Sequence, residues 1–407
     1  MKRVLGIVLV ITLALLTGCS RETTKTANNR HDAWAYDLEF LVKELPKRHK
    51  NLFFQLDKKA FYWRAEEIRD QIDELTDEEL IVELSRLVAS VGDAHTVVYP
   101  ELGRIYPLRF YWFKEGIYAI AASEEYAEVV NLKLETINGK PMEKVLAELR
   151  GVISHENEAS FKCLAVEYLL IPPIMQGLGI VDDACQMGFA DHQGEKVVVV
   201  SPADVDKIKY ILGTTERPLY RRHGDLYYWY EYLPEHRTLY FQYNVCADME
   251  QPFREFTEEM FAVIEDNVVD KLIVDLRNNS GGNSLVMQPF IGRIQKSSLN
   301  DRDGLFVVIG RRTFSSAILN ALQLKDSTEA TFVGEATGGK PNHYGEVGAL
   351  FLKNTGITVT YSKKYFKHSN EDVDSLLPDV IIEPSIVDYK RGQDPVVDWI
   401  LSGPPRV

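Results

Sequence analysis

Three polar segments in the C-terminal half of the chain contain residue types that can carry out acyl-transfer chemistry. They are residues 275–282, 313–317 and 334–342. The first ends in two glycines, the second contains Ser315 and Ser316, and the third contains Lys340. A serine hydroxyl can attack a carbonyl carbon, and a lysine that burial keeps neutral can accept its proton. Backbone N–H groups of a glycine-rich loop can stabilise the resulting oxyanion.

Each segment also has a simpler interpretation by itself. Two glycines can make a tight turn between a strand and a helix, and serine is a common first residue before a helix. The third segment has the pattern Gly-x4-Gly-Lys, which is typical of a phosphate-binding loop. However, Pro341 stands where a hydroxyl should bind magnesium, and no long helix is predicted after it. We therefore do not expect ATP or GTP binding.

The elements that must position these segments alternate between strands and helices. We expect strands at 226–233, 238–243, 272–276, 305–309 and 331–333, and helices at 253–268 and 316–324. This alternation predicts an α/β fold in which helices cover a sheet. Each of the three polar segments directly follows one of the last three strands.

Together and in this order, the three segments resemble the catalytic domain of the tail-specific (C-terminal processing) protease family. The family pattern Asp-x-Arg-x-Asn-x-Gly-Gly matches 275–282, a serine among small residues matches 313–317, and Gly-Glu-x-Thr-x-Gly-Lys matches 334–340. Ser315 and Lys340 are 25 residues apart (340 − 315), which is the separation expected of Ser–Lys members. The resemblance covers residues 225–407, and relatives include tricorn-like and interphotoreceptor-retinoid-binding-protein-like proteins.

The resemblance implies a crotonase-like α/β core of mixed sheet and helices, and a serine peptidase without a cofactor or metal. Ser315 would be the nucleophile and a neutral Lys340 the general base. The oxyanion hole would use N–H groups of Gly281 or Gly282 and of Ser316. Four further residues would orient the catalytic groups or bind the substrate peptide: Asn279, His343, Tyr344 and Glu346.

One feature of the sequence departs from the family pattern, and another leaves the identity of the general base undecided. Ile318 stands where members commonly carry a glutamate, three residues after the nucleophile. Residues 92–96 (Gly-Asp-Ala-His-Thr) resemble the family's Asp-x-His-Thr segment, and tricorn-like members use histidine as the base. His95 is therefore the alternative general base, since imidazole is the commonest one.

The N-terminal half of the chain has a different pattern of predicted secondary structure. Residues 34–104 are predicted to be mainly helical, with Thr76 opening the last helix. Residues 105–205 are predicted to be rich in strands, beginning with a hairpin at 108–113 and 117–122. A turn at 137–141 followed by a short helix resembles part of a PDZ-like peptide-holding module. The catalytic domain is then expected to span residues 206–407.

The N-terminus has the features of an export signal. Lys2 and Arg3 precede an apolar run at 4–16, which is too short to span a membrane comfortably. Leu-Thr-Gly-Cys at 16–19 resembles a bacterial lipobox and ends the predicted lipoprotein signal, residues 1–19. The resemblance implies that the Cys19 thiol is acylated and that Cys19 becomes the new N-terminus after cleavage. Residues 20–33 would form a polar linker to an extracytoplasmic, membrane-anchored body.

Composition limits the function classes. The formal net charge of -14 argues against nucleic acid as a partner. The three cysteines other than Cys19 have irregular spacing, which suits neither a disulfide framework nor a metal site. Two alternatives to a peptidase stay open: a lipoprotein of the same fold that binds peptide or a hydrophobic ligand without cleaving it, and an esterase or transacylase.

Overall fold

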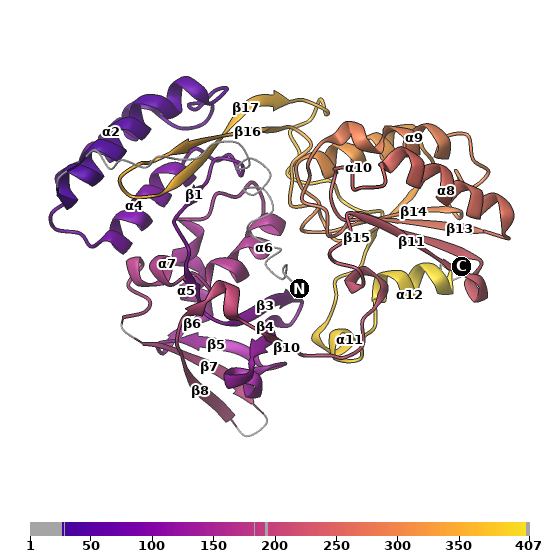
Figure 1. Cartoon of the computed structure of the whole chain (residues 1–407), viewed down its shortest axis with the longest axis horizontal. Helices are drawn as coiled ribbons and strands as arrows, with labels where there is room; N and C mark the ends of the chain where they lie inside the picture. The colour runs from indigo at the N-terminus through magenta and orange to yellow at the C-terminus, as the bar shows by residue number, and fades with distance from the viewer. Residues whose placement is uncertain (1–26, 28, 183, 192–193, 404–407) are drawn as a thin grey trace.

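The computed structural model describes residues 27, 29–182, 184–191 and 194–403. The predicted signal, Cys19 and most of the linker lie outside these residues. Figure 1 shows two units, one containing the N-terminal helices and a β-rich sheet, the other containing a second sheet covered by helices. No helix in the described part of the chain is long and apolar enough to cross a membrane.

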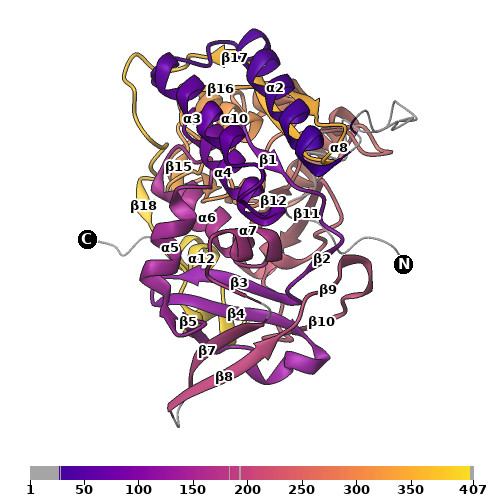
Figure 2. The same cartoon turned by 90° about the vertical axis from the view of Figure 1, so that its left-hand side faces the viewer.

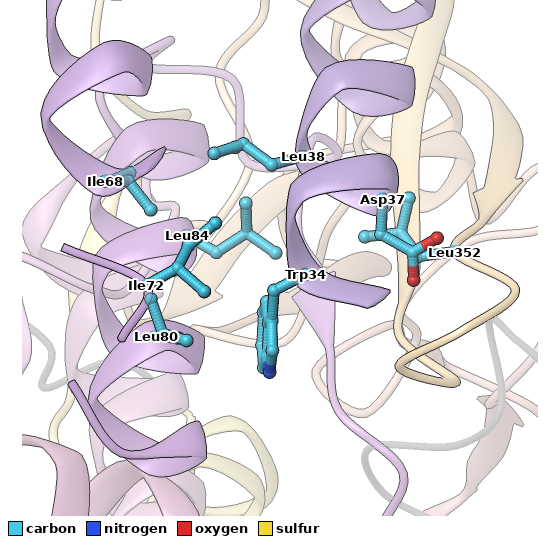
Figure 3. A pocket seen from close by; sticks show the side chains of 8 residues that line it. All are labelled: Trp34, Asp37, Leu38, Ile68, Ile72, Leu80, Leu84 and Leu352. Atoms are coloured by element: carbon cyan, nitrogen blue, oxygen red, sulfur yellow. The ribbon is translucent and has the colours of Figure 1, made fainter. Parts of the chain in front are cut away.

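Three helices form the N-terminal region, as predicted. They are α2 (Arg30–Arg48), α3 (Lys58–Asp70) and α4 (Asp77–Ala89). The last begins at a capping box, in which Thr76 Oγ1 accepts from the N–H of Glu79 and the Glu79 carboxylate accepts from the N–H of Thr76. The buried faces of the helices pack around Leu41 and Leu84. Figure 3 shows the centre of this core, where a space of about 10 Å³ has room for no more than a single water molecule.

A hairpin from the C-terminal half returns to these helices. It consists of β16 (His343–Phe351) and β17 (Thr358–Phe366), and β17 also pairs with β1 (Val98–Tyr99). In both views the hairpin lies over the N-terminal helices (Figures 1 and 2). The expected boundary of the catalytic domain is therefore wrong here, because residues 343–366 complete the core of the N-terminal region.

A seven-stranded sheet follows the helices. Its strands are β3 (Leu108–Phe113), β4 (Gly116–Ser123), β5 (Lys133–Ile137), β6 (Lys140–Pro141), β7 (Cys185–Asp191), β8 (Gly194–Val200) and β10 (Tyr210–Leu212), with β2 (Arg104–Ile105) and β9 (Ala203–Asp204) paired beside it. The predicted hairpin is β3–β4, and the predicted helix after the turn is α5 (Met142–Arg150). β10 pairs with β4, so this unit extends beyond the expected boundary at 205. The PDZ-like assignment stays a prediction.

Two more helices, α6 (Glu158–Tyr168) and α7 (Pro172–Gly177), lie between the N-terminal helices and this sheet (Figure 2). α7 packs against α4, and α6 packs against β3. The apolar residues of these helices and of the sheet share one core, which includes Phe161 and Ile174. The helical and β-rich parts therefore form a continuous body.

The second unit is the predicted α/β domain. Its sheet has the order β11 (Tyr228–Leu233), β12 (Thr238–Tyr243), β13 (Lys271–Asp275), β14 (Leu305–Ile309), β15 (Thr331–Gly334) and β18 (Val380–Ile381). β11 is antiparallel to β12, and the remaining neighbours are parallel. The mixed sheet confirms the predicted fold class.

Helices cover both faces of this sheet because successive strand residues point to opposite faces. The helices are α8 (Phe253–Asp266), α9 (Gln288–Ile294), α10 (Ser316–Ser327) and α12 (Pro395–Ser402), whereas α11 (Ile386–Lys390) packs against β3 and β4 of the first unit. Leu272 and Val274 pack in the core formed with α8, α9 and α10, whereas Ile273 packs in the core formed with α12. The three described cysteines, Cys163, Cys185 and Cys246, are free thiols.

Candidate active site

The three polar segments meet at one edge of the second sheet. β13, β14 and β15 are parallel neighbours, so their carboxyl ends lie side by side. Each of the segments begins where one of these strands ends. This edge of an open parallel sheet is the usual place for a ligand site in α/β folds.

Ser315 has an unusual backbone conformation directly before α10. Its φ of 52° and ψ of -126° lie in a region that non-glycine residues rarely adopt. Its side chain does not cap the helix and makes no hydrogen bond within the described part of the chain. A strained serine on a sharp turn between a strand and a helix presents its hydroxyl outward, as a nucleophile requires. Ser316 Oγ instead donates to the carbonyl of Gly282 over 2.6 Å.

The glycine loop packs directly against this serine. A Cβ at Gly281 would lie 2.8 Å from the Cβ of Ser315, and the φ of Gly281 is +117°, so only glycine fits without strain. The N–H of Gly281 donates to Asn279 Oδ1 over 2.9 Å and is not available to a substrate. Within the described part, the N–H groups of Gly282 and Ser316 donate to no protein acceptor. These two are therefore the available donors for an oxyanion.

Asn279 holds the loop and does not reach the substrate. Its side chain is fully buried, and its amide donates to the carbonyl of Tyr243 over 2.9 Å. The backbone carbonyl of Asn279 accepts a hydrogen bond from the N–H of Phe314 over 3.2 Å. The expected substrate contact at Asn279 is therefore wrong, whereas an orienting role agrees with these bonds.

His95 lies beside the nucleophile segment. Its ring stacks on Phe314, the residue before Ser315, with 4.5 Å between ring centroids and 24° between planes. Only 4% of the residue is exposed, and neither ring nitrogen has a hydrogen-bond partner among the described residues. A buried imidazole with both nitrogens unpartnered is uncommon, because burying an unsatisfied polar group costs about 1–3 kcal/mol.

The carboxylate of Asp93 lies near His95 and accepts several hydrogen bonds. It accepts from the N–H of His95 over 2.9 Å and from the hydroxyls of Thr96 and Ser362 over 2.5 and 2.6 Å. His49 Nε2 lies 3.0 Å from its second oxygen, and His95 Nδ1 lies 3.8 Å from its first. The hydrogen bond from His49 and the positive field of His95 hold the pKa of Asp93 far below its ordinary value despite burial. Asp93 therefore keeps a negative charge next to His95.

Glu156, between α5 and α6, is a second carboxylate near His95. Burial raises its pKa to about 7, although the positive field of His95 opposes the shift. Ligand atoms of Asp93, His95 and Glu156 all lie within 4.8 Å of one another, a spacing that could suit a metal ion. The oxygens of Asp93 already accept four hydrogen bonds, however, so they offer little to a metal.

Lys340 does not have the environment that a neutral base requires. Its Nζ lies 3.1 Å from Asp374 Oδ1 and 3.4 Å from Asp372 Oδ1. Burial alone would lower the pKa of Lys340, but the bonds and charges of these two carboxylates raise it above its ordinary value. These ion pairs favour a charged Lys340, so the structure does not support the neutral base that was expected. Its backbone contributes instead, since its N–H donates to Glu156 and its carbonyl pairs with His343 Nδ1.

The three expected residues on β16 have different surroundings. His343 is buried with its ring 5.8 Å from that of His95, and burial lowers its pKa to about 4. Tyr344 packs on His49, with 5.2 Å between ring centroids. Glu346 is exposed and its carboxylate lies 3.6 Å from the Lys363 ammonium, and its expected role in orienting groups or binding substrate stays a prediction.

Ile318, in the first turn of α10, is fully buried in the core of the second unit. Its Cγ2 lies 3.3 Å from where a Cβ on Gly339 would stand. The side chain thus packs the glycine loop after β15 against α10. A charged residue here would have to be buried among apolar neighbours.

Sequence reasoning missed His49 and Glu156. Neither belongs to the matched segments, and a histidine near a helix end or a glutamate between two helices gives no local signal of a site. His49 reaches Asp93, and Glu156 reaches His95, only because the end of α2 and the α5–α6 connection fold against residues 92–96.

Comparison with solved structures confirms the predicted resemblance to the tail-specific protease family at the level of the fold. No protein-family model and no curated protein matches the sequence.

Solved structures of this architecture are similar along almost the whole chain. Mature CPAF in complex with lactacystin matches 89% of this chain and 96% of its own, at 15% identity and a TM-score of 0.63. A serine-to-alanine mutant of CPAF matches 89% and 95%, at 13% identity and a TM-score of 0.64. The photosystem II D1 C-terminal processing protease matches 88% and 94%, at 13% identity and a TM-score of 0.40. The similarity to CPAF establishes a shared fold.

Proposed function

We propose that this chain is a serine peptidase that uses Ser315 as nucleophile and His95 as general base. The observation that carries the proposal is the buried His95 ring, which stacks on Phe314 and has both nitrogens unpartnered beside a strained Ser315. A general base that accepts the proton of the Ser315 hydroxyl needs such a free nitrogen. Catalytic hydrogen bonds are often absent from structures without substrate and form on binding.

In this mechanism His95 accepts the proton of Ser315 Oγ while the oxygen bonds to the scissile carbonyl carbon. The carbonyl oxygen becomes an oxyanion and receives N–H donors from Gly282 and Ser316. The negative charge of Asp93 stabilises the imidazolium. His95 then protonates the leaving amine, the C–N bond breaks, and an acyl-enzyme forms. A water, deprotonated by His95, attacks the ester and releases the acid and Ser315.

The proposed substrate is a peptide or protein. The acidic chain does not suit nucleic acid, and its fold is shared with CPAF. Lys340 takes no part in proton transfer in this proposal. Its ion pairs with Asp372 and Asp374 fix the loop after β15 close to Glu156.

We also propose that the protein is exported and held on a bacterial cell-envelope membrane by a lipid on Cys19. The basic start, short apolar run and Leu-Thr-Gly-Cys segment support this. Metabolic labelling with a fatty acid should mark the parent chain and not Cys19→Ser, while Cys163→Ser is still labelled. Equal labelling of parent and Cys19→Ser would contradict the anchor.

A fluorophosphonate probe tests the nucleophile and the base together. It should label the full-length parent and Lys340→Ala, and it should fail to label Ser315→Ala and His95→Ala. Circular dichroism must show that all variants fold. Labelling that persists in Ser315→Ala would remove Ser315 as nucleophile, and labelling that persists in His95→Ala would remove His95 as its base.

A further inference from the structure

A second cavity of about 320 Å³ lies between the two units, lined by residues of both. Its walls come from β3 and α6 on one side, and from the ends of β14 and β15 and the start of α12 on the other (Figure 1). The volume lies within the range of small-molecule sites, which is about 300–1000 Å³. Neither Ser315 nor His95 is among its lining residues.

The wall is mainly apolar. Representative side chains are Leu108, Phe110, Val166, Leu170, Val308 and Ile309. Protein interiors are normally packed with few voids larger than a water molecule. A mainly apolar space of this size at the junction of two units is therefore shaped for an apolar ligand rather than for packing alone.

Charged groups in the wall favour an anionic end on that ligand. The lining holds five cationic side chains, Arg109, Lys162, Arg277, Arg311 and Arg312, and three carboxylates, Glu167, Glu335 and Asp394. Asp275 and Glu383 pair with Arg277 and Arg311 from outside the lining. The attraction for an anion therefore comes from the cations without a close carboxylate partner.

Two of these cations lack a close carboxylate partner in the described part of the chain: Arg312 has only a long ion pair, and Lys162 has none. Arg277 and Arg311 form close ion pairs, at 2.7 Å to Asp275 and 2.6 Å to Glu335. Arg312 lies 3.8 Å from Glu167, which is too long for a hydrogen bond. Lys162 lies 5.8 Å from the centroid of the Trp112 ring, and it has no ion pair within the described part of the chain.

We propose that this cavity binds an apolar chain that ends in a carboxylate, with the chain among the apolar side chains and the carboxylate beside Lys162 and Arg312. A free acyl carboxylate and the carboxyl end of an apolar peptide share this chemistry. A ligand bound there contacts both units, one of which holds His95 and the other Ser315. The inference does not depend on the proposed peptidase activity.

Displacement of a fluorescent dansyl-undecanoate probe from full-length Ser315→Ala tests the proposal without interference from cleavage. Dodecanoate, or an apolar peptide with a free carboxyl end, should displace it at least about 10-fold more strongly than dodecanol or the amidated peptide. Which of the two acids acts identifies the source of the carboxylate. The proposal would be overturned if neither acid displaced the probe, or if dodecanol and the amidated peptide displaced it as strongly as the acids.

Two variants locate the site. Val166→Trp should fill the cavity and weaken probe binding at least about 10-fold. Lys162→Glu, on the partly exposed rim, should weaken it without disturbing the core. Lys325→Glu is the control, because Lys325 also lies over an aromatic ring, 5.6 Å from Phe332, but does not line the cavity. Unchanged binding in folded Val166→Trp and in Lys162→Glu would overturn the proposal.

Discussion

At the scale of single residues, the histidine is better suited than the lysine to be the base. The sequence indicates both His95 and Lys340 as candidate bases, since residues 92–96 and 334–340 each match a family segment. The sequence could not decide between them because the protonation of Lys340 depends on Asp372 and Asp374, which lie more than thirty residues away in an unremarkable loop. Long-range ion pairs of this kind leave no local pattern.

Glu156 provides a test of the electrostatics around His95. Its pKa is raised from 4.5 to about 7 by burial, so the folded chain binds more protons than the unfolded chain between these values. The free energy of unfolding should therefore fall as the pH rises through this window. Glu156→Gln removes the effect, and its stability relative to the parent should increase by about 2 kcal/mol between pH 5 and pH 8.

Urea unfolding of parent and variant at both pH values measures this difference. Glu158→Gln, two residues further on and exposed, is the matched control and should show little change relative to the parent. A stability difference between Glu156→Gln and the parent that is the same at pH 5 and pH 8 would mean that Glu156 is not buried as a raised-pKa acid.

At the scale of elements, the spacing of apolar residues predicted most of the strands and helices of the second unit. The strands from β11 to β15 and the helices α8 and α10 lie where apolar runs and helical spacing predict them. The β16–β17 hairpin was not predicted to join the N-terminal helices, because its partners are more than two hundred residues away in sequence. The sequence offered three candidate N–H donors for the oxyanion, and the bond from Gly281 to Asn279, which excludes one of them, has no sequence signal.

The loop after β13 should not tolerate a side chain at Gly281. Gly281→Ala would place a Cβ 2.8 Å from that of Ser315 at a φ of +117°. We expect kcat/KM for a peptide to fall at least about 100-fold through displacement of Ser315 and Gly282, with a loss of about 1–3 kcal/mol in unfolding free energy.

Gly292→Ala in α9 is the control for this change. A Cβ at Gly292 meets no atom within 4 Å, and alanine favours a helix. Its activity should stay at the parent level. If Gly281→Ala were as active as Gly292→Ala, the position of Ser315 would not depend on the glycine loop.

At the scale of the whole molecule, the site exists only because distant segments of the chain interlock. His95 and Glu156 come from the N-terminal body, Ser315 comes from the second sheet, and the hairpin after Lys340 returns to the N-terminal helices. Asp37 in α2 joins this hairpin to the body. It accepts from the backbone N–H groups of Asn354 and Thr355 over 3.0 and 2.8 Å, and from both of their side chains.

Asp37→Ala should therefore destabilise the junction. It would leave buried donors without an acceptor, so we expect the free energy of unfolding to fall by about 3 kcal/mol and peptide cleavage to weaken with it. Glu39→Ala, exposed on the same helix, should change unfolding by less than about 0.5 kcal/mol. Equal unfolding free energies for the two variants would show that the hairpin is held by other contacts.

The most direct test of the central claim compares cleavage of a mixed peptide library by the full-length parent, His95→Ala and Lys340→Ala, with Ser315→Ala as the blank. We predict that His95→Ala loses at least about 1000-fold in kcat/KM. Lys340→Ala should stay within about 10-fold of the parent, because its backbone bonds to Glu156 and His343 survive the change. Loss in a folded Lys340→Ala, with activity kept in His95→Ala, would contradict the account and restore the lysine as the base.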